Sequence, residues 1–295
     1  MKNLFFLAVL LLFFGCAKEE TPKIAAQAAK KYAVNFKLSG FSQTTAPYEK
    51  HASISADAVD EYAEVIYYFV YDSHGNFIHS LMQEIEDPDF GTITDSLAQG
   101  SYTIAVVATQ KNYLFRSTAQ TFEDFTASLP EAQIRLGGLP SNFIPKDIFF
   151  KKISLTVDSE NVTKPLTLDR IAGKLEIDIL DHVPGYTYLY VINEGYFFKL
   201  ANETTVDGSE QEQWGSGNIC ILTLNTDYPI TLTIYAYDTS NDLIATKTVD
   251  NIDVDRNKRT IVRGNMFENE PESANESFSI SVNGSWSEDN TIINF

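Results

Sequence analysis

Cysteine, tryptophan, histidine and basic residues are scarce in this 295-residue sequence: it has 2 Cys, 2 Trp, 4 His and 22 Lys plus Arg, against 40 Asp plus Glu. The formal net charge of −18 repels phosphate backbones, so nucleic-acid binding is not expected. Cys220 lies in a strand-like run and is predicted to be a small, buried hydrophobic residue. The hydrophobic fraction of 44%, with 15 Tyr and 20 Phe, is ample for packed cores and argues against disorder.

Long apolar runs are also missing, apart from one at the start. Residues Leu4 to Phe14 are all apolar, follow the basic Lys2 and precede Gly15-Cys16. This run is shorter than the ~20 residues that a membrane-spanning helix needs, but it suits the hydrophobic region of a secretory signal. A small residue directly before the cysteine resembles a bacterial lipoprotein signal, in which Cys16 becomes the lipid-carrying mature N-terminus. A plain secretion signal is the alternative.

The residues after Cys16 suggest where the lipid would hold the chain. The acidic pair Glu19-Glu20 resembles the surface-export tag of lipoproteins in the Bacteroides group. The resemblance implies a palmitate-type anchor in the outer membrane, with the protein exposed on its outer face. A lipid anchor of this kind holds a soluble domain to a membrane without crossing it.

Motifs of catalysis and metal binding are missing as well. The sequence has no HExxH, GxSxG, P-loop or GxGxxG pattern. The stretch from Asp253 is rich in Asp like a calcium loop, but Lys258 and Gly264 stand where an EF-hand needs Gly and Glu. We therefore expect no catalytic residue, no metal and no cofactor, and hence no enzyme.

The sequence is rich in residue patterns that are typical of β-strands. Residues 17–31 suit a tether, and alternating or β-rich runs then recur, as in Glu64–Asp72, Tyr102–Thr109 and Ile230–Tyr237. Turn residues separate these runs at intervals of about 8–12 residues, which is typical of an all-β sandwich. Residues 112–129 are the exception and are predicted to hold a short helix or a lid.

One internal repeat favours two similar domains. Residues 67–78 align with residues 233–244 at an offset of 166, each with a strand, Tyr-Asp, a polar turn and a second strand. The Asp can accept backbone N–H bonds, while Gly75 or Asn241 can adopt a positive φ. The predicted organisation is a signal (1–15), a tether (16–31), an N-terminal domain (32–167) and a C-terminal domain (168–295).

Three further stretches carry a family resemblance. Residues 168–179 (LDRIAGKLEIDI), 254–267 (VDRNKRTIVRGNMF) and the pieces within 90–104 (FGTI and GSYTI), together with the lipoprotein start, resemble the fimbrillin-like lipoproteins of Bacteroidetes, especially fimbrial anchor and accessory subunits. The resemblance implies two tandem transthyretin-like, Greek-key β-sandwich domains. It also implies a role in a fimbrium, or pilus, or in cell adhesion. The partners would be other subunits of the same family and host or bacterial surface ligands.

Fimbrillin-like subunits assemble by strand exchange, in which one subunit donates an extended segment to the open sheet of another. The C-terminal segment with Phe278, Ile280, Val282 and Trp286 suits that role, because the first three residues alternate onto one face of a strand. The alternative is that this strand closes its own domain.

The N-terminal tether favours an anchor over a stalk subunit. Stalk subunits of the family lose their lipidated segment to a trypsin-like protease, usually after Arg, and this chain has no Arg before Arg116. Lys30-Lys31 is a poorer cleavage site. We therefore expect an anchor or accessory subunit that keeps its lipid.

A surface glycan-binding lipoprotein of a nutrient-uptake system is the alternative function. Such a protein presents exposed aromatic rings to sugars, and Trp214, in a polar stretch, is the candidate residue. Packing of a loop or cap is the competing interpretation of Trp214.

The anchor hypothesis predicts the mass of the mature N-terminus. We expect mass spectrometry of the surface form to find an N-terminal peptide that begins at lipidated Cys16. An unlipidated N-terminus beyond residue 31 would contradict anchoring by this chain.

Overall fold

A computed structural model of the chain contains β-strands almost throughout, which confirms the all-β prediction. Its one helix among the described residues is α1 (Val59–Tyr62). The strands belong to one compact unit, Lys31–Phe295. The structure describes residues 29–42, 59–110, 125–135, 147–224, 228–267, 278–284 and 289–292.

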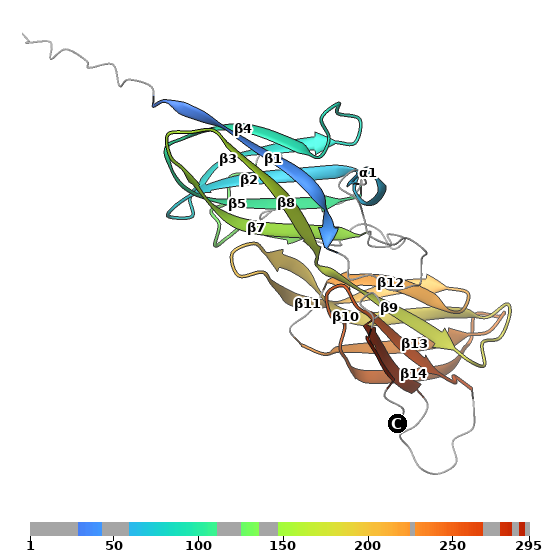
Figure 1. Ribbon diagram of the computed structural model, residues 1–295. Helices are drawn as coiled ribbons and strands as arrows, with labels where there is room; N and C mark the ends of the chain where they lie inside the picture. Colours follow the sequence, from blue (N-terminus) through green and yellow to red (C-terminus); the bar gives the residue numbers. More distant parts are fainter. Residues whose placement is uncertain are drawn as a thin grey trace, which may run out of the picture. The chain divides into compact units, whose positions relative to one another are not determined.

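The first half of the chain forms one seven-stranded sheet that folds into two layers (Figure 1). Its edge strands meet through side chains: Gln83 donates to the carbonyl of Thr92 (2.9 Å), and His79 lies 2.9 Å from Asp95. Apolar side chains fill the space between the layers, Phe36 and Tyr68 among them. In sheet order the strands are β3 (Phe77–Glu84), β2 (Val65–Asp72), β5 (Gly100–Thr109), β7 (Ile148–Val157), β8 (Val162–Arg170), β1 (Lys31–Ser42) and β4 (Thr92–Ala98).

The second half forms two five-stranded sheets around a second core. One contains β11 (Thr204–Gly215), β10 (Thr187–Lys199), β13 (Ile230–Tyr237) and β14 (Leu243–Ile252), with β6 (Gln133–Arg135) pairing to β10. The other contains β12 (Ile219–Leu224), β9 (Ala172–Ile179), β15 (Arg259–Gly264), β16 (Phe278–Gly284) and β17 (Asp289–Ile292). Apolar residues alternate along β9, and Leu175, Ile177 and Ile179 are all buried in this core.

Strand connectivity repeats between the two halves. Strands β1, β2, β3, β4, β5, β7 and β8 pair with one another as β9 to β15 do, with one exception: β7 pairs with β8, whereas β14 and β15 lie in different sheets. In each half the first and last strands of the set pair in parallel, β1 with β8 and β9 with β15, and the other pairings are antiparallel. The change from one set to the next falls at Ile171, because β8 continues to Arg170.

The two Tyr-Asp turns have the geometry that the sequence predicted. In both, one Asp carboxylate oxygen accepts two backbone N–H bonds of 2.8–3.0 Å. The left-handed position is Gly75 (φ 80°) in the first turn and Asn241 (φ 66°) in the second. The acceptors are Asp72, with donors His74 and Asn76, and Asp238, with donors Ser240 and Asp242.

These turns nevertheless occupy different places in the repeated topology. The first joins β2 to β3 and the second joins β13 to β14, whereas the strands equivalent to β2 and β3 are β10 and β11. The sequence repeat therefore reflects local turn chemistry rather than the register of the two strand sets.

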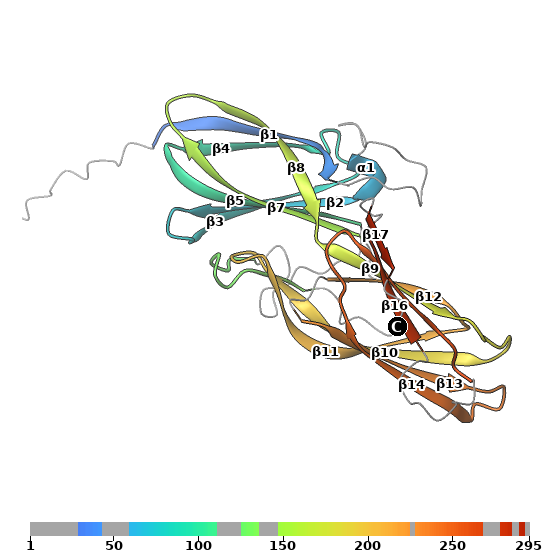
Figure 2. The ribbon, with the colours of Figure 1, turned by 60° about the horizontal axis from the view of Figure 1, so that its bottom comes forward.

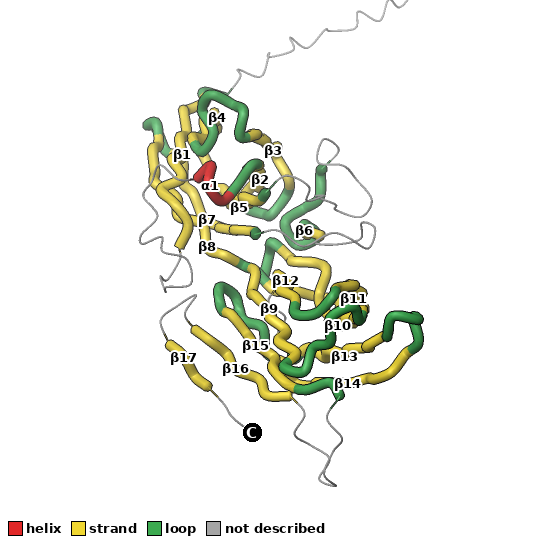
Figure 3. Tube along the Cα trace, turned by 90° about the vertical axis from the view of Figure 1, so that its right-hand side faces the viewer, coloured by secondary structure: helices red, strands yellow, loops and turns green. Residues whose placement is uncertain are grey.

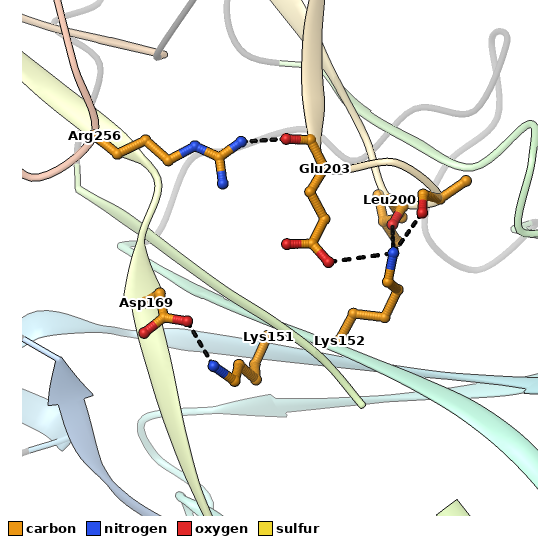
Figure 4. A network of polar contacts seen from close by, with 7 residues as sticks. Lys151, Lys152, Asp169, Leu200, Glu203 and Arg256 are labelled. Atoms are coloured by element: carbon orange, nitrogen blue, oxygen red, sulfur yellow. Dashed lines mark hydrogen bonds and ion pairs between the residues drawn. The ribbon is translucent and has the colours of Figure 1, made fainter. Parts of the chain in front are cut away.

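A mixed network joins the first sheet to the strands that follow it (Figure 4). Lys152 on β7 lies 3.2 Å from the Glu203 carboxylate and also donates to the carbonyls of Leu200 and Ala201. Arg256 donates to the carbonyl of Glu203. Beside this network, a shared apolar cluster includes Phe150, Ile171 and Phe198 from both sides of the connection. Both polar and apolar contacts thus hold the two strand sets together.

Arg170 at the end of β8 is a buried part of the same connection. Its guanidinium binds the Asp147 carboxylate with two contacts (2.9 and 2.6 Å), donates to Asn257 Oδ1 (3.2 Å) and lies 5.2 Å from the centre of the Phe149 ring. Because the pair is withdrawn from water, each charge depends on the other.

Replacing Arg170 should therefore destabilise the protein strongly. We expect Arg170→Met to lower the free energy of unfolding by about 3–5 kcal/mol, because Asp147 is left buried without its partner. Lys151→Met removes an exposed ion pair with Asp169 (2.7 Å) and is the matched control, with an expected loss below about 1 kcal/mol. Urea denaturation measures both, and equal losses would contradict the role given to the buried pair.

Candidate interaction surfaces

Some predicted site residues lie outside the described residues. These are Cys16 and Trp286, so their roles stay predictions. Within the described ranges, no helix is long and apolar enough to cross a membrane. The same residues contain no group of three or more His, Cys, Asp or Glu side chains that could hold a metal ion.

The predicted strand-exchange segment extends the sheet of its own chain. Strand β16 pairs antiparallel with β15, and β17 pairs with β16 (Figures 2 and 3). Phe278, Ile280 and Val282 are alternate residues of β16, and their backbone partners include Val262 and Thr260, both buried. The backbone of this segment therefore adds two strands to the sheet beyond β15, the last strand of the repeated set.

The outer face of β12, β9 and β15 is occupied by ion pairs. Glu176 contacts Arg259 (2.5 Å) and Lys174 (3.0 Å), and Arg263 contacts Asp178 (2.6 Å). The pairs of Arg259 and Arg263 join β15 to β9, and the Lys174–Glu176 pair lies along β9 itself. This face is therefore polar and largely self-satisfied.

Cys220 was predicted to be buried, and that prediction is wrong. The residue is exposed on the edge strand β12, opposite Glu176 of β9. Alternation explains the error, since the neighbouring Ile221 faces the core and Cys220 faces away from it.

Trp214 belongs to strand β11 and not to a loop or cap. It is 48% exposed, and its ring centre lies 5.5 Å from that of Tyr237 on β13, with the planes tilted by 39°. The backbone partner of Trp214 is Leu189 of β10, whose other partner is Tyr235 of β13. The sheet thus gathers aromatic residues from separate strands, which no local sequence pattern could show.

The two strand sets and the added C-terminal strands define an all-β protein built from packed sheets. The family model of the fimbrillin-A associated anchor proteins Mfa1 and Mfa2 matches residues 19–291. The chain belongs to this family, as its sequence resemblance suggested, and is accordingly a fimbria-associated protein. No functionally curated protein matches it in sequence.

Solved structures share the fold at low sequence identity. A candidate polysaccharide-binding protein from Bacteroides thetaiotaomicron is 12% identical, with a TM-score of 0.57 and coverage of 89% of this chain and 98% of that one. The fimbrial anchor protein Mfa2 from Porphyromonas gingivalis is 11% identical, with a TM-score of 0.55 and coverage of 86% and 98%. A candidate adhesin from Bacteroides ovatus is 11% identical, with a TM-score of 0.54 and coverage of 90% and 96%.

The ion pairs on the outer face of β9 should make stability depend on pH. Burial alone would raise the pKa of Glu176, but hydrogen bonds and charge attraction from Arg259 and Lys174 outweigh burial and lower this pKa below the usual 4.5. A carboxylate with a lowered pKa in the folded state stabilises the protein above that usual value, and the contribution disappears as the pH falls through the lowered pKa.

We therefore expect Glu176→Gln to be less stable than the parent at neutral pH, with the difference shrinking as the pH falls below the usual 4.5 and through the lowered pKa of Glu176. Chemical denaturation at stepped pH measures the difference. Glu160→Gln, at an exposed turn residue, is the control and should stay within about 0.5 kcal/mol of the parent at neutral pH. A difference for Glu176→Gln that widens in acid would refute this account of the pair.

Proposed function

We propose that the chain is a non-catalytic lipoprotein that anchors or extends a fimbria on the outer face of the outer membrane. The observation that carries the proposal is the family match, which begins at residue 19, three positions after Cys16. A lipid on Cys16 would hold the folded strands at the surface without a spanning helix. Retention of that lipid distinguishes an anchor or accessory subunit from a processed stalk subunit.

We further propose that the chain contains two tandem transthyretin-like domains. Support comes from the repeated connectivity of the two strand sets and from the separate cores of each set. The domain boundary in this proposal lies near Ile171 instead of residue 168, since β8 extends to Arg170.

Assembly with neighbouring subunits would use strand addition at the C-terminal edge. Strands β16 and β17 extend the sheet beyond β15, and β16 joins β15 through backbone pairing. Backbone hydrogen bonds of this kind can be exchanged between chains without any change in their chemistry. The alternation of Phe278, Ile280 and Val282 would supply side-chain specificity.

Nested truncations test this assembly mechanism. We expect deletion of residues 277–295, which removes β16 and β17, to leave a folded protein that no longer co-purifies with fimbriae. Strands β9 to β15, which correspond to the seven strands of the first set, all precede the deletion, which supports folding of the shortened chain. Circular dichroism and urea denaturation measure folding, and quantitative pull-down from surface extracts measures assembly.

Deletion of residues 285–295 is the matched control because it keeps β16 and removes β17. Loss of co-purification in the longer deletion alone would assign the contact to β16. Retained co-purification in both, with both proteins folded, would remove the C-terminal segment from the mechanism.

A further inference from the structure

The outer face of the sheet β11-β10-β13-β14 carries a connected apolar strip. Trp214 from β11 approaches Tyr237 from β13, and Leu243 from β14 is the backbone partner of Tyr237. Trp214 is 48% exposed and Leu243 is 53% exposed. Large apolar side chains that stay exposed and adjacent over three strands are typical of a binding surface.

Burial of Leu189 shows that the strip is continuous over the middle strand. Leu189 lies on this outer face, between Trp214 and Tyr235 in the pairing register, and yet is only 8% exposed. The side chains around it therefore cover β10, and the rings form one platform instead of isolated residues.

Hydroxyl groups and carboxylates surround this platform. Thr233 and Thr248 lie with their hydroxyl oxygens 3.3 Å apart, and Thr231 donates to Asp250 (2.9 Å) farther along the same face. The remaining polar residues of the face, by pairing register, are Thr187, Thr246, Asn193, Glu210 and Glu212.

The charge near the aromatic strip has one sign. Between Thr187 and Asn193 of β10 and on the strands that pair there, three described side chains are carboxylates (Glu210, Glu212 and Asp250) and none is Lys or Arg. Lys199 is on the same face by register, but at the far end of β10. The outer face of β12, β9 and β15 differs, since Lys174, Arg259 and Arg263 lie on it. An anionic ligand would meet uncompensated repulsion on the aromatic face.

We propose that this face binds a neutral polysaccharide, with Trp214 and Tyr237 as the stacking platform. A sugar ring has an apolar C–H face, which packs on aromatic rings, and a rim of hydroxyl groups, which pair with threonine hydroxyls and carboxylates. The aromatic strip supplies the apolar contact, and the polar side chains around it supply the hydrogen bonds. The proposal concerns a sheet face and does not depend on strand addition at the C-terminal edge.

Other occupants fit the face less well. Acidic polysaccharides, nucleic acids and anionic lipid headgroups are disfavoured by the three carboxylates. A protein partner in a stable interface favours an apolar centre depleted of charge, whereas this strip is narrow and bordered by Glu212 and by the turn at Asp238.

Affinity electrophoresis of the folded mature chain tests the proposal. The gels contain yeast mannan, xyloglucan, dextran or galactan as neutral probes and polygalacturonate as the acidic probe, and a neutral-glycan array extends the set. We expect retardation by at least one neutral polymer and none by polygalacturonate. Trp214→Ala and Tyr237→Ala should each weaken that binding by about 30-fold, the usual effect of removing a dominant contact residue.

Two variants serve as controls. Trp214→Phe keeps a ring and should retain most of the binding, while Leu180→Ala removes another large, 60% exposed side chain off this face and should bind like the parent. Thermal denaturation confirms that each variant is folded. Absence of retardation and of any array signal, or undiminished binding by both alanine variants, would overturn the proposal. So would loss of fimbrial co-purification in Trp214→Ala without any glycan binding by the parent, because the face would then bind protein.

Discussion

Parallel pairing between the first and last strands of each strand set is the constraint on which the architecture depends. Strand β1 lies between β4 and β8, so the layer opposite β2 and β5 exists only when the chain's start has met residues far along the sequence. Ala33, for example, donates to Asn161, 128 positions away. Bringing such distant segments together costs conformational entropy, and packing of the core offsets that cost. Long-range pairing and core packing must therefore form together.

The connection between the strand sets depends on a different balance. Arg170 and Asp147 are withdrawn from water beside the apolar cluster that contains Phe150 and Phe198, and Lys152 donates to carbonyls of the β10–β11 turn. A buried charge pair adds little net stability but penalises any arrangement that separates it. The pair therefore specifies how the end of β8 meets the strands that follow.

The outer faces divide the interaction chemistry. One face carries ion pairs around Glu176, and the other carries Trp214 and Tyr237, with Lys199 only at the far end of β10. The two faces therefore differ in the chemistry of their outward-facing residues. A scaffold shared at about 11% identity with solved relatives can in this way present different surfaces to different partners.

Local physical chemistry made several features predictable. Strand pattern identified β13, and the Asp-turn pattern identified the hairpins at Gly75 and Asn241, because strand periodicity and turn hydrogen bonds are short-range effects. Strand β11 was missed, since its run of Glu and Gln has the composition of a loop and becomes a strand only by pairing with β10.

The sequence by itself determined the all-β class, the family and the turn geometry, since these depend on residues close together in the chain. Only the tertiary structure decided the registers of the repeated strand sets, the exposure of Cys220 and the meeting of Trp214 with Tyr237. The physical reason is that strand pairing joins distant residues, and a single-residue shift in register moves each side chain to the opposite face.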